Sequence, residues 1–341
     1  MRGTVEKLVG IVTVAVLLAL GTSAQAEPFK LIVTETQTPL VPNSVADLAL
    51  RLGYYKKAGV DVELVRVQQT PSAVAALRSG EGDMANISFH TALQLVARKQ
   101  MALKGVISPD KALPFLIAAK KGITAPKGLE GKVFGVARVG SLDYTLSRAV
   151  LGNLGVDINK LRYLSIGQPA IRAKSLAADR IDATTISIGV WTTIPDKSAL
   201  HVLIDQARFY KAAPFVSKLN VVTAAVAKAK AKQVGAVVRA IIMASRDFAK
   251  NPQLWVKAME AARPDVKPQA LETLAKAYRE SWSVNGGLNL KEINYTTDMD
   301  YKSKDLKGLA RVSPKSWIDT AFIDHVLKEI GTDSKMDETG R

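Results

Sequence analysis

Apolar and polar positions alternate along this chain in blocks that predict short strands separated by amphipathic helices. Residues 29–34 form an apolar stretch of strand length, and residues 45–52 carry apolar side chains at the spacing of one helix face. Gly59 is expected to end that helix. Further strands are expected at residues 60–65, 84–87, 103–107, 114–119, 133–137, 161–165, 183–186, 202–204 and 215–222.

Helices are expected between these strands, and they alone are expected after residue 222. Those between strands should start at residue 70 and cover residues 88–99, 142–154 and 170–178; those after residue 222 should cover residues 226–250, 253–262, 268–283 and 316–329. Residues 286–312 show no clear period and are expected to form a long loop. Strands alternating with helices favour right-handed crossovers, so the pattern predicts an α/β fold with mainly parallel sheets and a helical C-terminal part.

One segment recurs along the chain. Residues 77–88 match residues 176–187 at a constant offset of 99. Identical residues pair Leu77 with Leu176, Asp83 with Asp182, Ile87 with Ile186 and Ser88 with Ser187. Each copy ends a helix, turns tightly and enters a strand that finishes at a serine. Chance identity is the alternative, but the equivalent places of the two copies favour a duplication into two lobes.

The chain is basic, with 47 Lys+Arg against 31 Asp+Glu among 341 residues and a formal net charge of +16. Its basic residues are spread out, and aromatic residues make up only 6% of the chain. These features argue against a nucleic-acid partner, which requires a basic stripe or stacking platforms. An apolar content of 48% is typical of a globular protein and not of a disordered one.

The first 26 residues show the three-part pattern of a secretory signal peptide. Arg2 and Lys7 provide a basic start, Leu8 to Leu20 is an uncharged apolar run, and Ala26 ends a small-residue cleavage site. A transmembrane anchor is the alternative, but a helix over this run spans about 20 Å against a hydrocarbon core of about 30 Å. We therefore expect cleavage after Ala26 and a periplasmic location.

The chain lacks the usual signatures of enzymes and metal sites. It contains no cysteine, which excludes disulfides and thiol nucleophiles. Its three histidines are far apart, and it has no G-x-S-x-G, GxxxxGK[ST] or HExxH motif. We therefore expect no catalytic activity, no cofactor and no metal.

Ligands of open α/β sheets bind outside the carboxyl ends of the strands, where helix N-termini point. Two such lobes facing each other would enclose a ligand between them. The candidate ligand-binding residues follow strands in one lobe or the other: Thr36, Gln37, Asn86, Ser88 and His90 in the first, and Arg138, Gly140, Ser141, Ser187 and Trp191 in the second.

The most informative of these candidates lie between Arg138 and Ser141, where a strand leads into a helix whose N-cap would be Ser141. Free N–H groups at such a helix start bind anions, Gly140 permits close approach, and Arg138 adds a charge-assisted hydrogen bond. An ordinary capped helix with a solvated arginine is the alternative. His90 fits a ligand contact and a simple helix-start residue equally well. Glu35 lies beside this site, and its charge is unfavourable for a purely anionic ligand.

Three longer segments carry a family resemblance: GYYKKAGVDVELV at 53–65, ALRSGEGDMA at 76–85 and GLEGKVFGV at 128–136. They resemble the periplasmic substrate-binding proteins of the nitrate, sulfonate and taurine group of ABC transporters. The same superfamily includes thiamine-pyrimidine binding and synthesis proteins. The resemblance covers roughly residues 29–222 and implies the two-lobe periplasmic-binding-protein fold, with two crossover strands near 118–122 and 215–222.

The resemblance also implies a domain division and a function. Lobe 1 would comprise residues 27–118 and 223–330, lobe 2 residues 119–222, and residues 331–341 a flexible tail. The protein would capture a small organic anion or zwitterion, similar to a sulfonate, carboxylate or nitrate, and deliver it to the membrane permease of an ABC transporter. We expect a monomer. The alternatives are a receptor for a tripartite carrier, a pyrimidine-binding or pyrimidine-synthesising relative, and a chemoreceptor partner or scaffold without transport.

Overall fold

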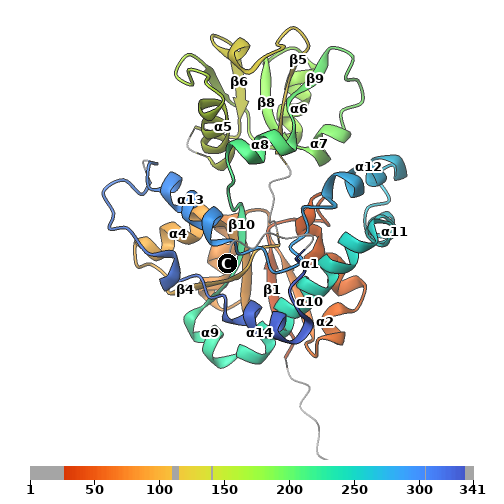
Figure 1. Cartoon of the computed structure of the whole chain (residues 1–341), viewed down its shortest axis with the longest axis vertical. Coiled ribbons are helices and arrows are strands. Elements are labelled where there is room, and N and C mark those ends of the chain that lie inside the picture. Colours follow the sequence, from red (N-terminus) through yellow and green to blue (C-terminus); the bar gives the residue numbers. More distant parts are fainter. Residues whose placement is uncertain (1–26, 110–114, 140, 304, 335–341) are drawn as a thin grey trace, which may run out of the picture.

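The computed structural model shows two five-stranded sheets, one above the other, with helices packed against both (Figure 1). Sheet 1 contains, in spatial order, β2 (Val62–Arg66), β1 (Phe29–Val33), β3 (Met84–Ser88), β10 (Lys218–Thr223) and β4 (Leu103–Ile107). Sheet 2 contains β7 (Arg162–Ser165), β6 (Val133–Val136), β8 (Ala183–Ser187), β5 (Phe115–Lys120) and β9 (Leu200–Ile204). The structure describes residues 27–109, 115–139, 141–303 and 305–334, so the expected signal peptide and residues 335–341 of the expected tail lie outside it.

The two sheets have the same strand arrangement, which confirms an α/β fold of two lobes. In sheet 1, β1 runs parallel to β2 and β3, and β10 lies antiparallel between β3 and β4. In sheet 2, β6 runs parallel to β7 and β8, and β5 lies antiparallel between β8 and β9. The bounds of β3 and β8 differ by the predicted offset of 99, so the repeated segments 77–88 and 176–187 occupy equivalent places.

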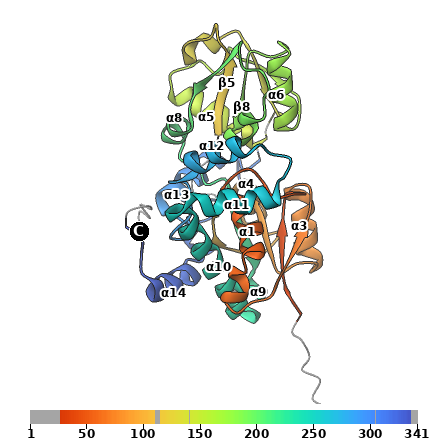
Figure 2. The same cartoon turned by 90° about the vertical axis from the view of Figure 1, so that its right-hand side faces the viewer.

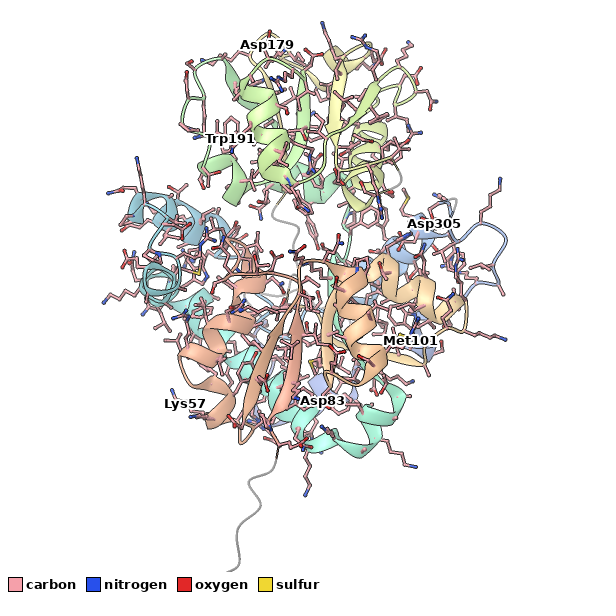
Figure 3. The ribbon with its side chains drawn as sticks, turned by 180° about the vertical axis from the view of Figure 1, so that it is seen from behind. Lys57, Asp83, Met101, Asp179, Trp191 and Asp305 are labelled. Atoms are coloured by element: carbon pink, nitrogen blue, oxygen red, sulfur yellow. The ribbon has the colours of Figure 1, made fainter. Side chains whose placement is uncertain are left out.

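The aspartate in the repeated turn before each of these strands makes the same two contacts, an ion pair with a lysine and a hydrogen bond from a backbone N–H group. Asp83 pairs with Lys230 at 2.6 Å and accepts a backbone N–H from β1. Asp182 pairs with Lys120 at 2.8 Å and accepts a backbone N–H from β6. Figure 3 shows Asp83 and Asp179 toward opposite ends of the molecule, so the repeated turns lie far from the boundary between the lobes.

The strands form where consecutive residues are apolar, because both faces of each sheet are covered. Leu31 and Ile32 point to opposite faces of β1, and both are fully buried. The helices that connect parallel strands in the two lobes include α3 (Thr70–Ser79), α4 (Phe89–Ala97), α5 (Leu142–Asn153) and α6 (Pro169–Ala177). Lobe 2 also contains η2 (Pro126–Leu129), α7 (Ile188–Thr192) and α8 (Gln206–Ala212).

The helix expected from residue 45 to Gly59 is divided in the structure. After η1 (Pro42–Ser44) come α1 (Val45–Arg51) and α2 (Tyr54–Lys57), separated at Gly53, whose φ of 75° no helix interior adopts. The sequence signal for this break was the Leu-Gly step itself, in the middle of an otherwise continuous helical pattern.

The C-terminal helices complete the core of lobe 1. The remaining elements are α9 (Ala224–Ala229), α10 (Ala231–Lys250), α11 (Pro252–Ala262), α12 (Pro268–Tyr278), α13 (Leu290–Asp300), η3 (Pro314–Ser316) and α14 (Ala321–Ile330). Helix α10 packs against α1, α2, α11 and α14. Trp255, Trp282 and Trp317 are buried in this core.

The expected loop at 286–312 contains helix α13, so this prediction was wrong. The buried positions of α13 include Thr296, Thr297 and Asp300 as well as Ile293, and this polar face has no apolar period to detect. The available signal was its start, where the Asn289 side chain accepts hydrogen bonds from the N–H groups of Lys291 and Glu292.

Strand pairing places the change of lobe earlier in the chain than the expected boundaries at 118 and 222. Strand β5 pairs with β8 and β9 over its whole length, which assigns residues 115–120 to sheet 2. Strand β10 pairs with β3 and β4, which assigns residues 218–223 to sheet 1. Phe215 belongs to the lobe 2 core and Val216 to the lobe 1 core, so the second crossing occurs between them.

Candidate functional site

The carboxyl ends of the parallel strands in both sheets face the same boundary. After the chain crosses into lobe 2, β5 begins at Phe115, which pairs with Ser187 at the end of β8. After it crosses back, β10 begins at Lys218, which pairs with Ser88 at the end of β3. Because each returning strand starts at the boundary, the parallel strands must end there, together with the starts of the helices that follow them.

One side of this boundary is joined by α13 (Figures 1 and 2). Tyr295 packs its ring against Phe215 of the second crossing, with 5.4 Å between ring centroids, and accepts a hydrogen bond at its hydroxyl from Asn153 Nδ2 at 3.2 Å. Thr296 Oγ1 accepts the N–H of Val216 at 2.9 Å. Helix α13 therefore holds both lobes and the connection between them.

The other side of the boundary is joined by α7. Ile188 packs against the cores of both lobes. Gly189 approaches the loop after β1 so closely that a Cβ atom there would lie 2.6 Å from the carbonyl oxygen of Leu40. The lobes therefore contact each other through α7 on one side and α13 on the other.

The start of α5 differs from the prediction. Ser141 occupies the N-cap position, but its side chain accepts no hydrogen bond from the first turn of the helix. Its hydroxyl instead lies 2.7 Å from the carbonyl oxygen of Arg138 and 2.5 Å from Asp143 Oδ1. The predicted capping hydrogen bond is therefore wrong, and the first-turn N–H groups of α5 receive no side-chain cap from Ser141.

Arg138 lies in the same segment, and its side chain is exposed. Its guanidinium has no partner within the described part of the chain, while its backbone carbonyl accepts the N–H of Ser141 at 3.1 Å. Val139 beside it is 61% exposed. Gly140 lies outside the described residues. The segment thus presents a charged group next to an uncapped helix start at the boundary.

In lobe 1, the predicted site residue Asn86 forms hydrogen bonds with other buried side chains. It accepts a hydrogen bond from Asn43 Nδ2 at 3.0 Å and donates to Asn220 Oδ1 at 2.8 Å. These three amides form a buried row that runs from η1 to β3 and β10. Asn43 and Asn220 were not predicted, and no sequence pattern links positions so far apart.

Ser88 and Ser187 have equivalent roles in the two lobes. Ser88 caps α4 by accepting the N–H of Thr91 at 3.2 Å, and Ser187 caps α7 by accepting the N–H of Val190 at 3.2 Å. Both side chains also lie at the ends of boundary-facing strands. Their residue type fits a cap and a ligand contact equally, so a ligand role for them stays a prediction.

His90 joins α4 to the C-terminal part of lobe 1. Its Nδ1 lies 2.9 Å from Asp300 Oδ1 of α13, and its Nε2 lies 3.4 Å from Asp305 Oδ2. Burial alone lowers the pKa of His90, but the hydrogen bonds and charges of the two aspartates outweigh it and raise that pKa. Burial raises the pKa of Asp300, against the opposing effect of His90. Through these ion pairs, His90 links α4 to α13 and to Asp305 beyond it.

The remaining predicted residues are spread around the boundary. Thr36 and Gln37 are exposed in the loop after β1. Trp191 is partly buried against lobe 2, and the Nζ atom of Lys197 lies 5.5 Å from its ring centroid. Figure 3 shows Trp191 on the lobe 2 side. The structure thus brings Arg138 and Ser141 together, and it separates them from the His90 cluster in lobe 1.

Lys218 is a charged residue at this boundary that the sequence did not single out. Its Nζ donates to Thr34 Oγ1 at 2.8 Å and pairs with Glu35 Oε1 at 3.3 Å. Glu35, whose charge argued against an anionic ligand, is therefore partly neutralised. The signal was a lysine at the first position of the strand that returns to lobe 1.

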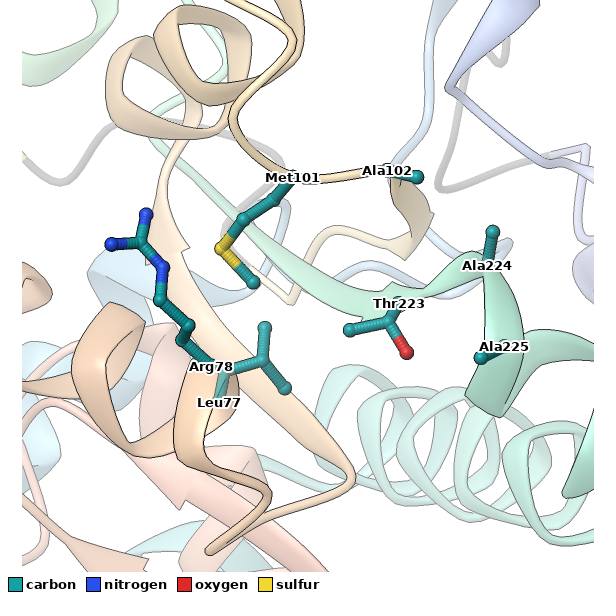
Figure 4. A pocket seen from close by; sticks show the side chains of 7 residues that line it. All are labelled: Leu77, Arg78, Met101, Ala102, Thr223, Ala224 and Ala225. Carbon is teal, nitrogen blue, oxygen red and sulfur yellow. The ribbon is translucent and has the colours of Figure 1, made fainter.

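A separate shallow pocket lies on lobe 1 (Figure 4). It is lined by Leu77, Arg78, Met101, Ala102, Thr223, Ala224 and Ala225. Thr223 is the last residue of β10, at the end of sheet 1 opposite to the boundary. This pocket is therefore distinct from the region that faces lobe 2.

No group of three or more histidine, cysteine or carboxylate side chains among the described residues is placed to hold a metal ion. None of the helices in the described part of the chain combines the length and apolar character needed to cross a membrane.

A known protein family matches most of this sequence. The model of the family described as NMT1/THI5 like matches residues 46–254, more than half of the chain. The chain belongs to the NMT1/THI5-like family. A search of curated protein sequences gave no match.

Solved structures of low sequence identity share the fold. A protein of Bordetella bronchiseptica RB50 is 16% identical with a TM-score of 0.71, and the match covers 89% of this chain and 98% of that one. The alkanesulfonate-binding protein SsuA of Xanthomonas axonopodis pv. citri, solved with MOPS bound, is 16% identical with a TM-score of 0.64, covering 84% and 96%. The desulfurization enzyme DSZB is 13% identical with a TM-score of 0.64, covering 89% and 99%. These likenesses show the periplasmic-binding-protein fold, which binding proteins and an enzyme share.

Proposed function

We propose that this protein is the substrate-binding component of an ABC importer and that it holds a small organic anion or zwitterion between its lobes. The observation that carries the proposal is the shared boundary, at which the carboxyl ends of six parallel strands from two equivalent lobes meet. Ligands of α/β folds bind at such strand ends, and a duplicated lobe supplies a second wall. The chain would act in the periplasm after loss of residues 1–26.

The charges at the boundary support an acidic group on the ligand. Arg138 is exposed beside the start of α5, whose first-turn N–H groups are not capped by Ser141. Backbone N–H groups and a guanidinium together favour a carboxylate or sulfonate. The pairing of Lys218 with Glu35 leaves both charges at the boundary, which also suits a zwitterion.

A thermal-shift screen of the chain without residues 1–26 tests this function. The probes are MOPS, taurine, nitrate, simple carboxylates, amino acids and pyrimidines, with N-methylmorpholine as a control that lacks the sulfonate of MOPS. A ligand at 1 mM with a micromolar dissociation constant should stabilise the fold by about 4 kcal/mol. Stabilisation by an acidic or zwitterionic probe, and none by N-methylmorpholine, is the expected result. A screen in which only neutral pyrimidines stabilise the protein would favour the pyrimidine-binding alternative.

An enzymatic role is the second candidate, because the desulfurization enzyme DSZB has the same fold. Product analysis after incubation with each stabilising probe separates the two. A binding protein returns its ligand unchanged, whereas recovery of an altered product would contradict the proposal.

A further inference from the structure

The most buried charge in lobe 2 belongs to Arg172, on α6. Only 2% of this residue is exposed. Its guanidinium donates to Thr184 Oγ1 at 3.1 Å, to Thr185 O at 3.0 Å and to Gly167 O. The pKa of Arg172 is lowered by burial, opposed by the charge of Asp143. A buried guanidinium costs desolvation energy, so its presence calls for a reason beyond packing.

The first lobe shows that this fold does not need an arginine there. At the offset of 99 that relates the two lobes, Ala73 on α3 corresponds to Arg172 on α6. Ala73 is fully buried, and its lobe has the same strand arrangement. The arginine is therefore a feature of lobe 2 alone.

The charged partner of Arg172 leads directly to the ligand segment. Arg172 Nη2 lies 3.5 Å from Asp143 Oδ2 in the first turn of α5. The same carboxylate accepts the N–H of Ala137 at 2.8 Å and the hydroxyl of Ser141 at 2.5 Å. Asp143 therefore forms hydrogen bonds with Ala137 and with Ser141, which lie on either side of Arg138. The neighbouring charge of Arg172 keeps the Asp143 carboxylate in this position.

We propose that Arg172 and Asp143 are positioning residues for the ligand, which fix Ala137 and Ser141 so that Arg138 and the start of α5 face the boundary. This inference rests on the proposed function. Arg172 also offsets the charge of Asp143, which would otherwise repel an acidic ligand at a helix start. Neither side chain needs to touch the ligand for this role.

The test combines hydrogen exchange with binding of MOPS, measured on the chain without residues 1–26. Arg172→Met should speed exchange of the peptide covering residues 137–143, and Asp143→Asn, a milder change, should do the same. Lys174→Met is the control, because Lys174 is exposed on the same helix. Unchanged exchange in both variants would overturn the proposal.

A double-mutant cycle separates positioning from general support of the fold. Arg172→Met should weaken MOPS binding by about tenfold or more. In that background, adding Arg138→Ala should cost less than about twofold, because Arg138 is no longer held toward the ligand. Full additivity of the two changes would overturn the proposal. If the unaltered protein binds neither MOPS nor any other acidic probe, the proposed function fails, and the exchange measurement still decides whether Arg172 orders the turn.

Discussion

At the scale of single residues, two ion pairs lie near the boundary, beside an exposed arginine whose guanidinium has no partner within the described part of the chain. Lys218 is paired with Glu35, and Arg172 lies beside Asp143. Arg138 is the exposed member of this group, and its backbone, not its side chain, takes part in the turn. A residue so placed contributes little to folding, so its charge is available to a ligand.

Arg138→Ala is therefore expected to weaken binding of an acidic ligand while leaving the fold intact. Loss of a charge-assisted hydrogen bond of about 1.5–3 kcal/mol corresponds to a rise of roughly 10- to 150-fold in the dissociation constant. Isothermal titration with MOPS measures this change. Arg162→Ala is the control, since Arg162 is an exposed arginine on strand β7 of the same lobe. An unchanged dissociation constant for Arg138→Ala would assign the arginine to the solvated surface.

The ion pairs of His90 lead us to expect that the stability of the folded chain depends on pH. The pKa of His90 is raised in the folded chain, where burial lowers it but its two aspartates raise it by more. Because folding raises the pKa of His90, protonated His90 stabilises the folded chain. This stabilisation is fully present below the pKa of about 6.5 that His90 has in the unfolded chain, and it is lost as the pH rises through the pKa that His90 has in the folded chain. Burial raises the pKa of Asp300, which also favours the folded chain at lower pH.

The unaltered protein should thus lose stability, relative to a His90→Gln variant, as the pH rises from about 6 to 8. Urea unfolding of both proteins across this range provides the measurement. The His325→Gln variant is the control, because 73% of the His325 side chain is exposed. Parallel pH profiles for His90→Gln and the unaltered protein would show that the His90 ion pairs contribute nothing.

Sequence reasoning at the residue scale could identify which positions lie at strand ends, but not what their side chains contact. Ser88 and His90 lie at the start of α4, where a helix was expected, whereas Ser187 was expected only at the end of a strand and in fact also caps α7. Whether such a residue caps its helix, pairs with a distant aspartate or meets a ligand depends on tertiary contacts. The pairing of His90 with Asp300 joins positions 210 residues apart, and no local pattern encodes it.

At the scale of elements, apolar periodicity predicted the strands well and failed where burial is polar. Strand β4 was predicted with its observed bounds. Helix α13 was missed, because it buries threonines and an aspartate, and α7 was missed because five residues are too few to show a period. Both helices make contacts across the boundary, so the sequence predicted the lobes better than their contact.

The close approach of α7 to lobe 1 predicts the effect of a single methyl group. Gly189→Ala would place a Cβ atom 2.6 Å from the Leu40 carbonyl oxygen, so the contact between α7 and the loop after β1 must open. Ligand binding should weaken, and the radius of gyration should increase in small-angle scattering. The control is Gly152→Ala on α5, where the nearest atom lies 3.8 Å from the new Cβ. An unchanged radius and affinity for Gly189→Ala would show that this contact does not govern how the lobes meet.

At the scale of the whole molecule, two equivalent lobes place their strand ends against a common boundary. The repeated segment predicted this duplication, and the matching strand orders bear it out. The second crossing, between Phe215 and Val216, falls within the crossover expected near 215–222, whereas β5 pairs with sheet 2 over its whole length and so lies beyond the first crossing. The fold itself does not decide between binding and catalysis, since an alkanesulfonate-binding protein and a desulfurization enzyme share it.

The central claim is that a ligand is held between the lobes, and differential hydrogen exchange with and without MOPS tests it most directly. The account predicts protection at once in two segments, the loop after β1 at residues 34–44 and the turn of lobe 2 at residues 137–143. The peptides around the separate pocket of lobe 1, at residues 101–102 and 223–225, should not change. Protection confined to one lobe, or centred on that pocket while both boundary segments stay unprotected, would contradict the account.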